Sequence, residues 1–261
     1  MRDDFCAFIL SHGRPDSVYT YDTLKRSGYT GKVYIVIDDE DIAGDLYRKR
    51  FGDKVLVFSK SEVAQNFDEG DNTGKMRSTS YVRNAFWGLA KSVGCKHFIQ
   101  LDDDYADFGF RYNSRIDYEY RTCTSTLDGV WSAMLDFMES TPITSICMAQ
   151  GGDFIGGNPG KCRLRRKAMN SFICSTDRPF TIVGRLNEDV NTYVTLGSRG
   201  SLFFTTVYVY LSQKATQATS GGMTEAYLDS GTYQKSFFTV MYHPSSVKVG
   251  VLRDPRGSAS R

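Results

Sequence analysis

Long apolar runs, metal-binding cysteine pairs and a marked excess of charge are all missing from this sequence of 261 residues. No stretch approaches the roughly 18 consecutive apolar residues of a transmembrane helix, so we expect no membrane span. The formal net charge is only +2, so the overall charge does not indicate a polyanionic partner. The first residues carry acids where a secretory signal needs a basic and then an apolar stretch, which predicts a cytoplasmic protein.

Cysteine and histidine are too few, and too irregularly spaced, for most metal centres. The six cysteines contain no C-x-x-C pair. Cys6 and Cys147 lie in apolar runs, where a free thiol behaves as a small hydrophobe. We therefore expect neither disulfides nor a zinc site. The only histidines are His12, His97 and His243, so a site with several histidine ligands would be hard to build.

The common glycine motifs for phosphate binding are absent as well. Without G-x-x-x-x-G-K-[ST] or G-x-G-x-x-G, the sequence gives little support to a P-loop or dinucleotide-binding protein. The turn Ser11 to Pro15 follows the first apolar run. In it, Gly13 would let the backbone approach a ligand, and Arg14 could contact phosphate or ribose. Taken alone, this turn is equally consistent with an ordinary loop.

Short apolar runs alternate with stretches of helical length in the first 105 residues. The runs are predicted strands at Phe5–Leu10, Lys32–Ile37, Val55–Phe58 and His97–Leu101. The stretches between them are predicted helices over 17–27, 41–51 and 76–93. This alternation predicts βαβ units, and hence an α/β fold with a mostly parallel central sheet flanked by helices.

The second half is more varied, but no repeat or linker divides the chain. Helices are predicted over 127–140, 188–196 and 233–242, and strands over 146–149 and 202–211. We predict a single domain. Residues of about 1–105 would bind a donor or cofactor, and residues of about 106–250 would shape the acceptor side. The polar residues 254–261 are predicted to be a flexible tail.

Three consecutive acids, Asp102, Asp103 and Asp104, follow the fourth predicted strand. Unpaired buried carboxylates are costly, so these acids are either solvated in a surface turn or neutralised by a cation. An all-oxygen cluster favours Mg²⁺ or Mn²⁺ over zinc. A second acidic pair, Asp38 and Asp39, follows the second predicted strand. Ligands of open α/β sheets bind at the carboxyl ends of strands, so both clusters should face one crevice.

Further charged residues stand at predicted helix starts. Arg77 and Arg83 lie near the start of the helix over 76–93, where cations suit an anionic or nucleotide ligand. They are six positions apart and need not share a face, so one of them is expected to be only a surface charge. Glu188 and Asp189 open another predicted helix after Asn187, a favourable N-cap. Apart from this capping role, either acid could be a catalytic base near the metal.

Two more features bear on binding. His243, after an apolar stretch and before Pro244, is a candidate metal ligand, although a lone histidine is more often structural. A local basic patch could contact nucleic-acid phosphates or could be a solvated loop. The patch consists of Lys161, Arg163, Arg165, Arg166 and Lys167.

Together these elements resemble the GT-A glycosyltransferases, which use nucleotide-sugars and a divalent metal. The resemblance spans about residues 5–249. It rests on Asp38-Asp39 after a strand, the pair Arg83-Asn84, the D-x-D element Asp102-Asp103-Asp104, the x-E-D element Asn187-Glu188-Asp189, and His243.

More narrowly, the chain resembles the phage glycosyltransferases associated with TET/JBP oxygenases, which glycosylate 5-hydroxymethylpyrimidines in DNA. The segments that carry this likeness are Ser11 to Pro15, Phe98 to Asp104 and Arg185 to Val190. The resemblance implies a UDP-sugar donor and, as acceptor, DNA containing 5-hydroxymethylcytosine.

The resemblance also implies roles for individual residues. Asp104 would bind Mn²⁺ or Mg²⁺ with help from His243, and Asp102 would contact the donor ribose or a metal-bound water. Asp189, or else Glu188, would be the base of an inverting displacement. The remaining donor-binding candidates are Ser11, Arg14, Asp38, Asp39, Arg77, Arg83 and Asp103.

Two other functions fit parts of the sequence. A sugar nucleotidyltransferase also combines a nucleotide domain with metal-binding acids, but Ser11 to Arg14 is a poor version of its glycine-rich loop. An inactive glycosyltransferase-like module could bind nucleic acid through the basic patch, but it would not need the intact acidic residues. We therefore predict a metal-dependent, inverting glycosyltransferase.

Overall fold

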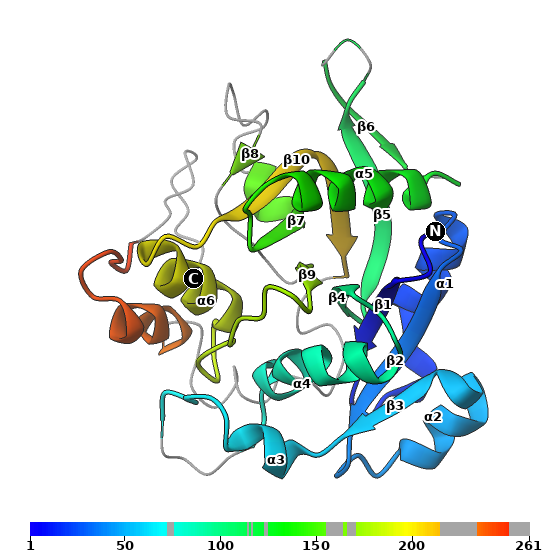
Figure 1. Ribbon diagram of the computed structural model, residues 1–261, viewed down its shortest axis with the longest axis horizontal. Coiled ribbons are helices and arrows are strands. Elements are labelled where there is room, and N and C mark those ends of the chain that lie inside the picture. Colours follow the sequence, from blue (N-terminus) through cyan, green and yellow to red (C-terminus); the bar gives the residue numbers. More distant parts are fainter. Residues whose placement is uncertain are drawn as a thin grey trace, which may run out of the picture.

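The computed structural model is organised around a mixed β-sheet with helices on both faces (Figure 1). It describes residues 1–71, 76–113, 115, 117–122, 125–154, 164–165, 171–214 and 234–250. The predicted tail at 254–261 lies outside these residues. Within the described ranges, no helix is both long and apolar enough to cross a membrane. The four cysteines in these ranges, Cys6, Cys95, Cys147 and Cys174, are buried and free.

The first half of the chain forms the parallel part of the sheet. Its strands are β1 (Phe5–Leu10), β2 (Lys32–Asp38), β3 (Val55–Phe58) and β4 (His97–Asp102), in the order β3-β2-β1-β4. All four predicted strands are confirmed. In β1, residues 5, 7 and 9 pack into one hydrophobic cluster, and residues 6, 8 and 10 pack into another. A strand covered on both faces has a continuous apolar sequence, which is why β1 was recognisable.

Helices supply both of these hydrophobic layers. They are α1 (Tyr19–Arg26), α2 (Gly44–Phe51), α3 (Lys60–Ala64), α4 (Thr79–Ser92), α5 (Leu127–Ser140) and α6 (Glu188–Ser198). A further helix covers residues 234–242. On one face Phe86 of α4 stacks on Phe8, with ring centroids 5.0 Å apart. On the other, Trp131 of α5 meets Phe5 edge to face at 5.8 Å.

The second half turns the sheet into a mixed one. Its strands are β5 (Tyr105–Tyr112), β6 (Tyr118–Thr122), β7 (Ser145–Ala149), β8 (Leu164–Arg165), β9 (Ile173–Ser175) and β10 (Phe203–Gln213). Strand β9 runs antiparallel to both β4 and β7, and β5 runs antiparallel to β10 and β6. The α/β class is therefore confirmed, but the sheet is less parallel than predicted. The reason is that β5 doubles back directly after the acidic cluster, without a crossover helix.

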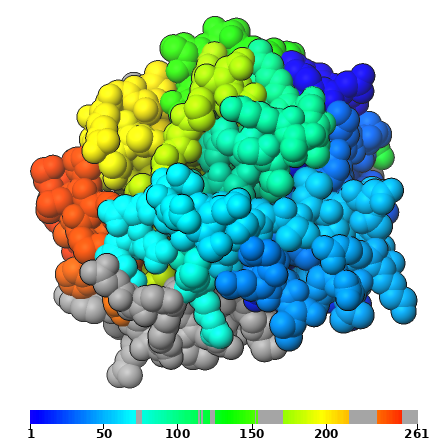
Figure 2. All heavy atoms as spheres, turned by 60° about the horizontal axis from the view of Figure 1, so that its bottom comes forward, coloured from blue at the N-terminus to red at the C-terminus, as the bar shows by residue number. Residues whose placement is uncertain are grey.

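Strand directions decide which loops meet. Because β4 and β7 are both antiparallel to β9, they run parallel to each other. The carboxyl ends of β1, β2, β4 and β7 therefore share one edge of the sheet. The helix over 234–242 packs against the segment before α4, where Tyr242 donates to the carbonyl of Asp68 at 2.9 Å. Figure 2 shows these two parts side by side, in orange and cyan.

Candidate active site

The two acidic clusters meet around the turn that follows β1. This strand lies between β2, which ends at Asp38, and β4, which ends at Asp102. The amide of Gly13 donates to Asp41 at 2.8 Å. Gly13 has φ +68°, a backbone conformation that favours glycine. The turn thus contacts the loops after both neighbouring strands.

Asp103 is the acid that holds the turn in place. Its side chain is fully buried, and Arg14 donates to both of its oxygens, from Nε at 2.8 Å and from Nη2 at 2.6 Å. Ser11 donates to the same carboxylate at 2.6 Å. The negative charge of the middle aspartate of the D-x-D element is therefore compensated by groups of the protein itself. It connects two of the predicted donor-binding residues, Ser11 and Arg14, to β4.

Asp38 lies in a second ionic network. It accepts from Nδ1 of His12 at 2.8 Å and pairs with Nζ of Lys60 at 3.0 Å. Burial opposes ionisation of Asp38, but these two partners outweigh it and lower its pKa to about 2. Asp39 is exposed, and its Oδ1 accepts from the backbone N–H of Lys60 at 3.0 Å. Sequence reasoning missed Lys60, because only the β2–β3 pairing brings it to Asp38.

Arg83 is at the centre of the remaining acids. Its side chain is 1% exposed, and Nη2 donates to Oδ1 of Asp102 at 2.6 Å. From the same side chain, Nε donates to Oε1 of Glu188 at 3.3 Å. One buried cation therefore connects the end of β4 to the start of α6. The structure places Arg83 inside the site as a link between these carboxylates.

Negative charge exceeds the compensation that Arg83 supplies. Burial raises the pKa of Asp102 to about 6; Arg83 opposes this shift, and nearby Asp104 and Glu188 add to it. Burial also raises the pKa of Asp189 to about 6, with the charge of Glu188 acting in the same direction. Two carboxyls that resist ionisation in one site are a common property of catalytic and cation-binding centres.

Asp104 provides a more specific indication of a cation. Its Oδ2 accepts from Nε2 of Gln213 at 3.1 Å. Its Oδ1 is buried and has no hydrogen-bond partner in the described part of the chain. A buried carboxylate oxygen without a partner is costly, and a hard cation would satisfy it.

The described part of the chain does not contain a closed set of metal ligands. Among the described residues, no three His, Cys, Asp or Glu side chains form a group that could hold a metal ion, so Asp104, Asp102 and His243 do not form one. His243 follows the helix over 234–242, where its Nδ1 lies 3.5 Å from Oγ of Ser245. Mg²⁺ and Mn²⁺ are nevertheless often held by one or two carboxylates together with substrate phosphates. Asp104 and Asp102 fit such an open site.

The start of α6 is organised differently from the sequence expectation. Asn187 occupies the N-cap position, but its side chain does not cap the helix. Instead it donates to Oγ1 of Thr239 at 2.5 Å, and Thr239 in turn donates to Asn191 at 2.7 Å. The helix over 234–242 is thereby tied to the turn that presents Glu188 and Asp189. Oδ1 of Asp189 accepts from the amide of Val190 at 2.8 Å.

The other predicted site residues are less central. Arg77 is exposed. Of the basic patch, only the backbone of Arg165 is described, as part of β8. The remaining members, Lys161, Arg163, Arg166 and Lys167, lie outside the described residues.

A further residue at the same edge of the sheet, in addition to Lys60, was missed by sequence reasoning. Gln150 follows β7 and is 8% exposed, and its Nε2 is buried without a hydrogen-bond partner in the ranges described. The backbone N–H of Gln150 donates to Oδ2 of Asp153 at 3.0 Å. No sequence signal identified Gln150, because the parallel alignment of β7 with β4 depends on β9.

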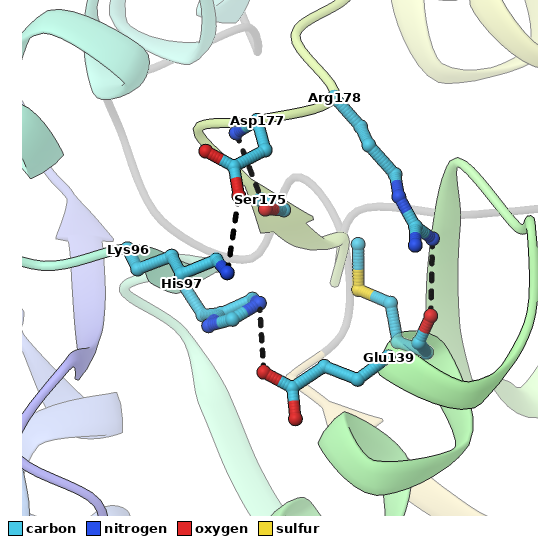
Figure 3. Close-up of a pocket in the computed structure, with 7 residues that line it drawn as sticks. Lys96, His97, Glu139, Ser175, Asp177 and Arg178 are labelled. Carbon is cyan, nitrogen blue, oxygen red and sulfur yellow. Dashed lines mark hydrogen bonds and ion pairs between the residues drawn. The ribbon is translucent and has the colours of Figure 1, made fainter.

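A separate cavity of about 220 Å³ lies at the opposite end of β4 (Figure 3). His97 begins β4 and lines this cavity, whereas Asp102 ends the strand. The charged groups around the cavity are paired with protein atoms. Lys96 meets Asp177 at 3.1 Å, and Arg178 donates to the carbonyl of Met138 at 3.0 Å. This cavity is therefore distinct from the acidic site.

The fold is that of a GT-A glycosyltransferase. The glucosyl-3-phosphoglycerate synthase of Mycobacterium tuberculosis, solved with Mn²⁺, UDP and phosphoglyceric acid, is similar in structure with a TM-score of 0.50 at 9% identity; the match covers 95% of this chain and 80% of that one. The same enzyme with UDP alone gives a TM-score of 0.48 at 11% identity, over 96% of this chain and 84% of that one. No curated protein matches the sequence.

The family is defined by sequence. The model of the TET-associated glycosyltransferases matches residues 5–222. The chain therefore belongs to the TET-associated glycosyltransferase family.

Proposed function

We propose that this glycosyltransferase is metal-dependent and inverting, and that it transfers a sugar from a UDP-sugar to 5-hydroxymethylcytosine in DNA. The observation that carries the proposal is the group of acids around buried Arg83 at the carboxyl edge of the sheet. It consists of Asp102, Asp104, Glu188 and Asp189. The Mycobacterium tuberculosis enzyme that shares the fold was solved with Mn²⁺ and UDP, which supports the choice of metal and donor.

Asp104 and Asp102 would hold the Mn²⁺ or Mg²⁺. The buried, unpartnered Oδ1 of Asp104 supports this role within the described part of the chain. A divalent cation bound there supplies positive charge against the negative charge that develops on the departing diphosphate. His243 remains a predicted further ligand, one that would have to complete the site with the donor present.

The donor would bind along the edge formed by the first 105 residues. Asp39 has an exposed carboxylate suited to nucleoside hydroxyl or amide groups, while Asp38 is held by His12 and Lys60 and would position the loop. Arg14 keeps the adjoining turn in place through Asp103. Residues of about 106–250 would then form the acceptor side.

Asp189 would act as the general base. A hydroxymethyl group is a weak nucleophile near pH 7, so its proton must be removed as it attacks the anomeric carbon. The pKa of Asp189, raised to about 6 by burial and by Glu188, leaves a carboxylate at pH 7 that is more basic than an ordinary aspartate. The acceptor oxygen forms the new bond, the bond to UDP breaks with its electron pair on UDP, and the proton moves to Asp189. One displacement inverts the anomeric centre.

Turnover with matched DNA substrates tests the proposal. A panel of UDP-sugars with Mn²⁺ would be incubated with duplexes that differ only in cytosine or 5-hydroxymethylcytosine. UDP release and nucleoside mass are measured, and the anomeric configuration of the product is determined by NMR. We expect a sugar-sized mass gain on the modified base alone, with inversion. Slow UDP release without a DNA product would show that the acceptor is wrong, and the absence of metal-dependent donor use would overturn the proposal.

A further inference from the structure

Gln150 is a buried glutamine whose amide nitrogen has no hydrogen-bond partner in the described part of the chain. Gln100, in the middle of β4, is buried as well, but both ends of its amide are occupied. Its Oε1 accepts from Nη1 of Arg83 at 3.4 Å, and its Nε2 donates to Sγ of Cys174 at 3.6 Å. A buried amide donor without a partner is costly, so the side chain of Gln150 is better explained by a ligand than by folding.

The turn after β7 holds the backbone of Gln150 in place. The backbone N–H of Gln150 donates to the carboxylate of Asp153, and its carbonyl accepts from the N–H of Asp153 at 2.9 Å. Between these two bonds the chain enters the short 3-10 helix Gly151–Phe154. Because the backbone is already fixed, little backbone entropy would be lost when the side chain of Gln150 binds a ligand.

Strand β10 connects this turn to the metal-binding acids. It lies between β7 and β5 in the sheet (Figure 1). Ala149, which precedes Gln150, pairs with Tyr210 of β10. Further along β10, Gln213 donates to Oδ2 of Asp104 at 3.1 Å. The step from Tyr210 to Gln213 spans about 10 Å of extended strand. Gln150 and Asp104 therefore lie on either side of the end of β10, where one donor molecule can contact both.

The same turn is close to the proposed base. Burial raises the pKa of Tyr193 to about 12, and the charges of Asp189 and Asp153 add to this shift, so both carboxylates lie near one phenol. Tyr193 follows Asp189 by one turn of α6 and shares its face of the helix. In a direct displacement the reacting sugar lies between the departing diphosphate and the attacking oxygen, and hence between Asp104 and Asp189. The turn that carries Gln150 approaches both.

The groups around Gln150 favour a hydroxyl as its ligand. The amide nitrogen requires a hydrogen-bond acceptor, whereas the ionised carboxylates of Asp153 and Asp189 require donors. A phosphate would be repelled by these carboxylates, and a carbonyl oxygen could not donate to them. A hydroxyl accepts and donates at once, so it can bind the amide and a carboxylate together.

We propose that Gln150 is a specificity-determining residue of the donor site, and that its amide donates a hydrogen bond to a hydroxyl of the transferred sugar. The inference rests on the proposed function for the position of the reacting centre between Asp104 and Asp189. It does not depend on the identity of the acceptor. A site that hydrogen-bonds a substrate hydroxyl discriminates against sugars in which this hydroxyl is missing or inverted. Gln150 would thus contribute to the choice of sugar.

Donor binding by Gln150→Met tests the inference without sugar transfer. Methionine keeps the length of the side chain and removes the amide. Affinities of the full chain for UDP-glucose, UDP-galactose, UDP-N-acetylglucosamine and UDP are measured by calorimetry with Mn²⁺. The UDP-sugar that the wild type binds most tightly should bind the variant about 3- to 10-fold more weakly. UDP, which has no sugar, should bind both proteins equally, and the preference among the three sugars should narrow in the variant.

Thermal melting without ligand gives a second readout. Gln150→Met should melt at the wild-type temperature or above it, because the substitution removes a buried donor that has no partner among the described residues. Gln100→Met is the matched control, since it breaks the hydrogen bonds to Arg83 and Cys174 and should melt at a lower temperature. A lower melting temperature for Gln150→Met with unchanged donor affinity would show that its amide stabilises the fold, and would overturn the inference.

The sugar contact and the proposed acceptor fail in different ways. Wild-type affinity of Gln150→Met for every UDP-sugar, or an equal loss for UDP and UDP-sugar, would show that the sugar contact is wrong. If the variant binds donors normally and only its KM for DNA with 5-hydroxymethylcytosine rises, the hydroxyl belongs to the acceptor and the inference is overturned. If donor binding weakens as expected but 5-hydroxymethylcytosine is not glycosylated, the sugar contact stands and the acceptor is wrong.

Discussion

The guanidinium of Arg83 lies 2.6 Å from Asp102 and also donates to Glu188. An acid of the D-x-D element and an acid of the x-E-D element therefore share one buried cation. Since Asp102 ends β4 and Glu188 begins α6, this side chain connects the proposed metal-binding and base-bearing parts of the site. A substitution of Arg83 should therefore affect both the metal-binding part and the base-bearing part of the site.

Replacing Arg83 should destabilise the protein strongly. Arg83→Met would leave buried carboxylates without their cation, at a cost of about 3–5 kcal/mol in the free energy of unfolding. The free energy of unfolding of Arg83→Lys should lie between those of Arg83→Met and the wild type. A lysine ammonium keeps the positive charge but lacks the planar guanidinium that contacts two carboxylates. Urea denaturation measures the effect. A loss below about 1 kcal/mol for Arg83→Met would contradict the buried link.

Asp103 and Asp104 should respond in opposite ways to the same substitution. Asp103→Asn weakens the two-pronged pair with Arg14, so the protein should melt at lower temperature while its affinity for Mn²⁺ is kept. Asp104→Asn removes a carboxylate with an unpartnered oxygen, so stability should be kept while Mn²⁺ binding is lost. Electron paramagnetic resonance of free Mn²⁺ and thermal melting measure both properties. The reverse pattern would show that the middle aspartate is the metal ligand.

Asp189→Asn should separate catalysis from structure. The amide keeps the shape but cannot take a proton, so transfer should fall by about 10²- to 10⁴-fold while UDP-sugar binding is retained. Glu188→Gln is the matched control, because Glu188 accepts from both Arg83 and Thr79 and its loss should lower stability. Turnover, calorimetric donor binding and melting are compared. Normal turnover in Asp189→Asn would exclude it as the base.

The raised pKa values of two buried aspartates predict a specific dependence of stability on pH. Asp102 and Asp189 have folded pKa values of about 6, whereas unfolded aspartate has a pKa of about 3.9. Between these values the folded state binds more protons, so the contribution of both acids to stability falls as pH rises from about 4 to about 6. Asp38, with its pKa lowered to about 2, acts in the opposite direction only below about pH 4.

Unfolding free energies of the wild type and Asp189→Asn between pH 4 and 7 test this dependence. The variant should lose less stability as pH rises, because one of the two acids is gone. Transfer by the wild type should increase over the same range as Asp189 loses its proton. Identical pH curves for the two proteins would show that Asp189 is not the perturbed group.

Regular elements with a simple pattern were predictable. Strands β1 and β3 and helix α5 have the predicted bounds, because a fully buried strand reads as an apolar run and α5 has a helical apolar period. The position of Asp38 and Asp102 at strand ends could also be predicted from the sequence. The antiparallel strands β5, β6 and β9 were not, since their pairing depends on partners distant in the chain.

The order of the amino acids alone specifies which chemical groups are available: acids directly after parallel strands, and basic and acidic residues at helix starts. The tertiary structure decided how three adjacent aspartates are used. Asp102 ends β4, whereas Asp103 and Asp104 form the turn between β4 and β5, so the three side chains meet different elements. Arg83 comes from α4, Arg14 from the turn after β1, and Gln213 from the end of β10. These partners are remote in sequence and become neighbours only when the sheet is assembled, so no local pattern could assign them.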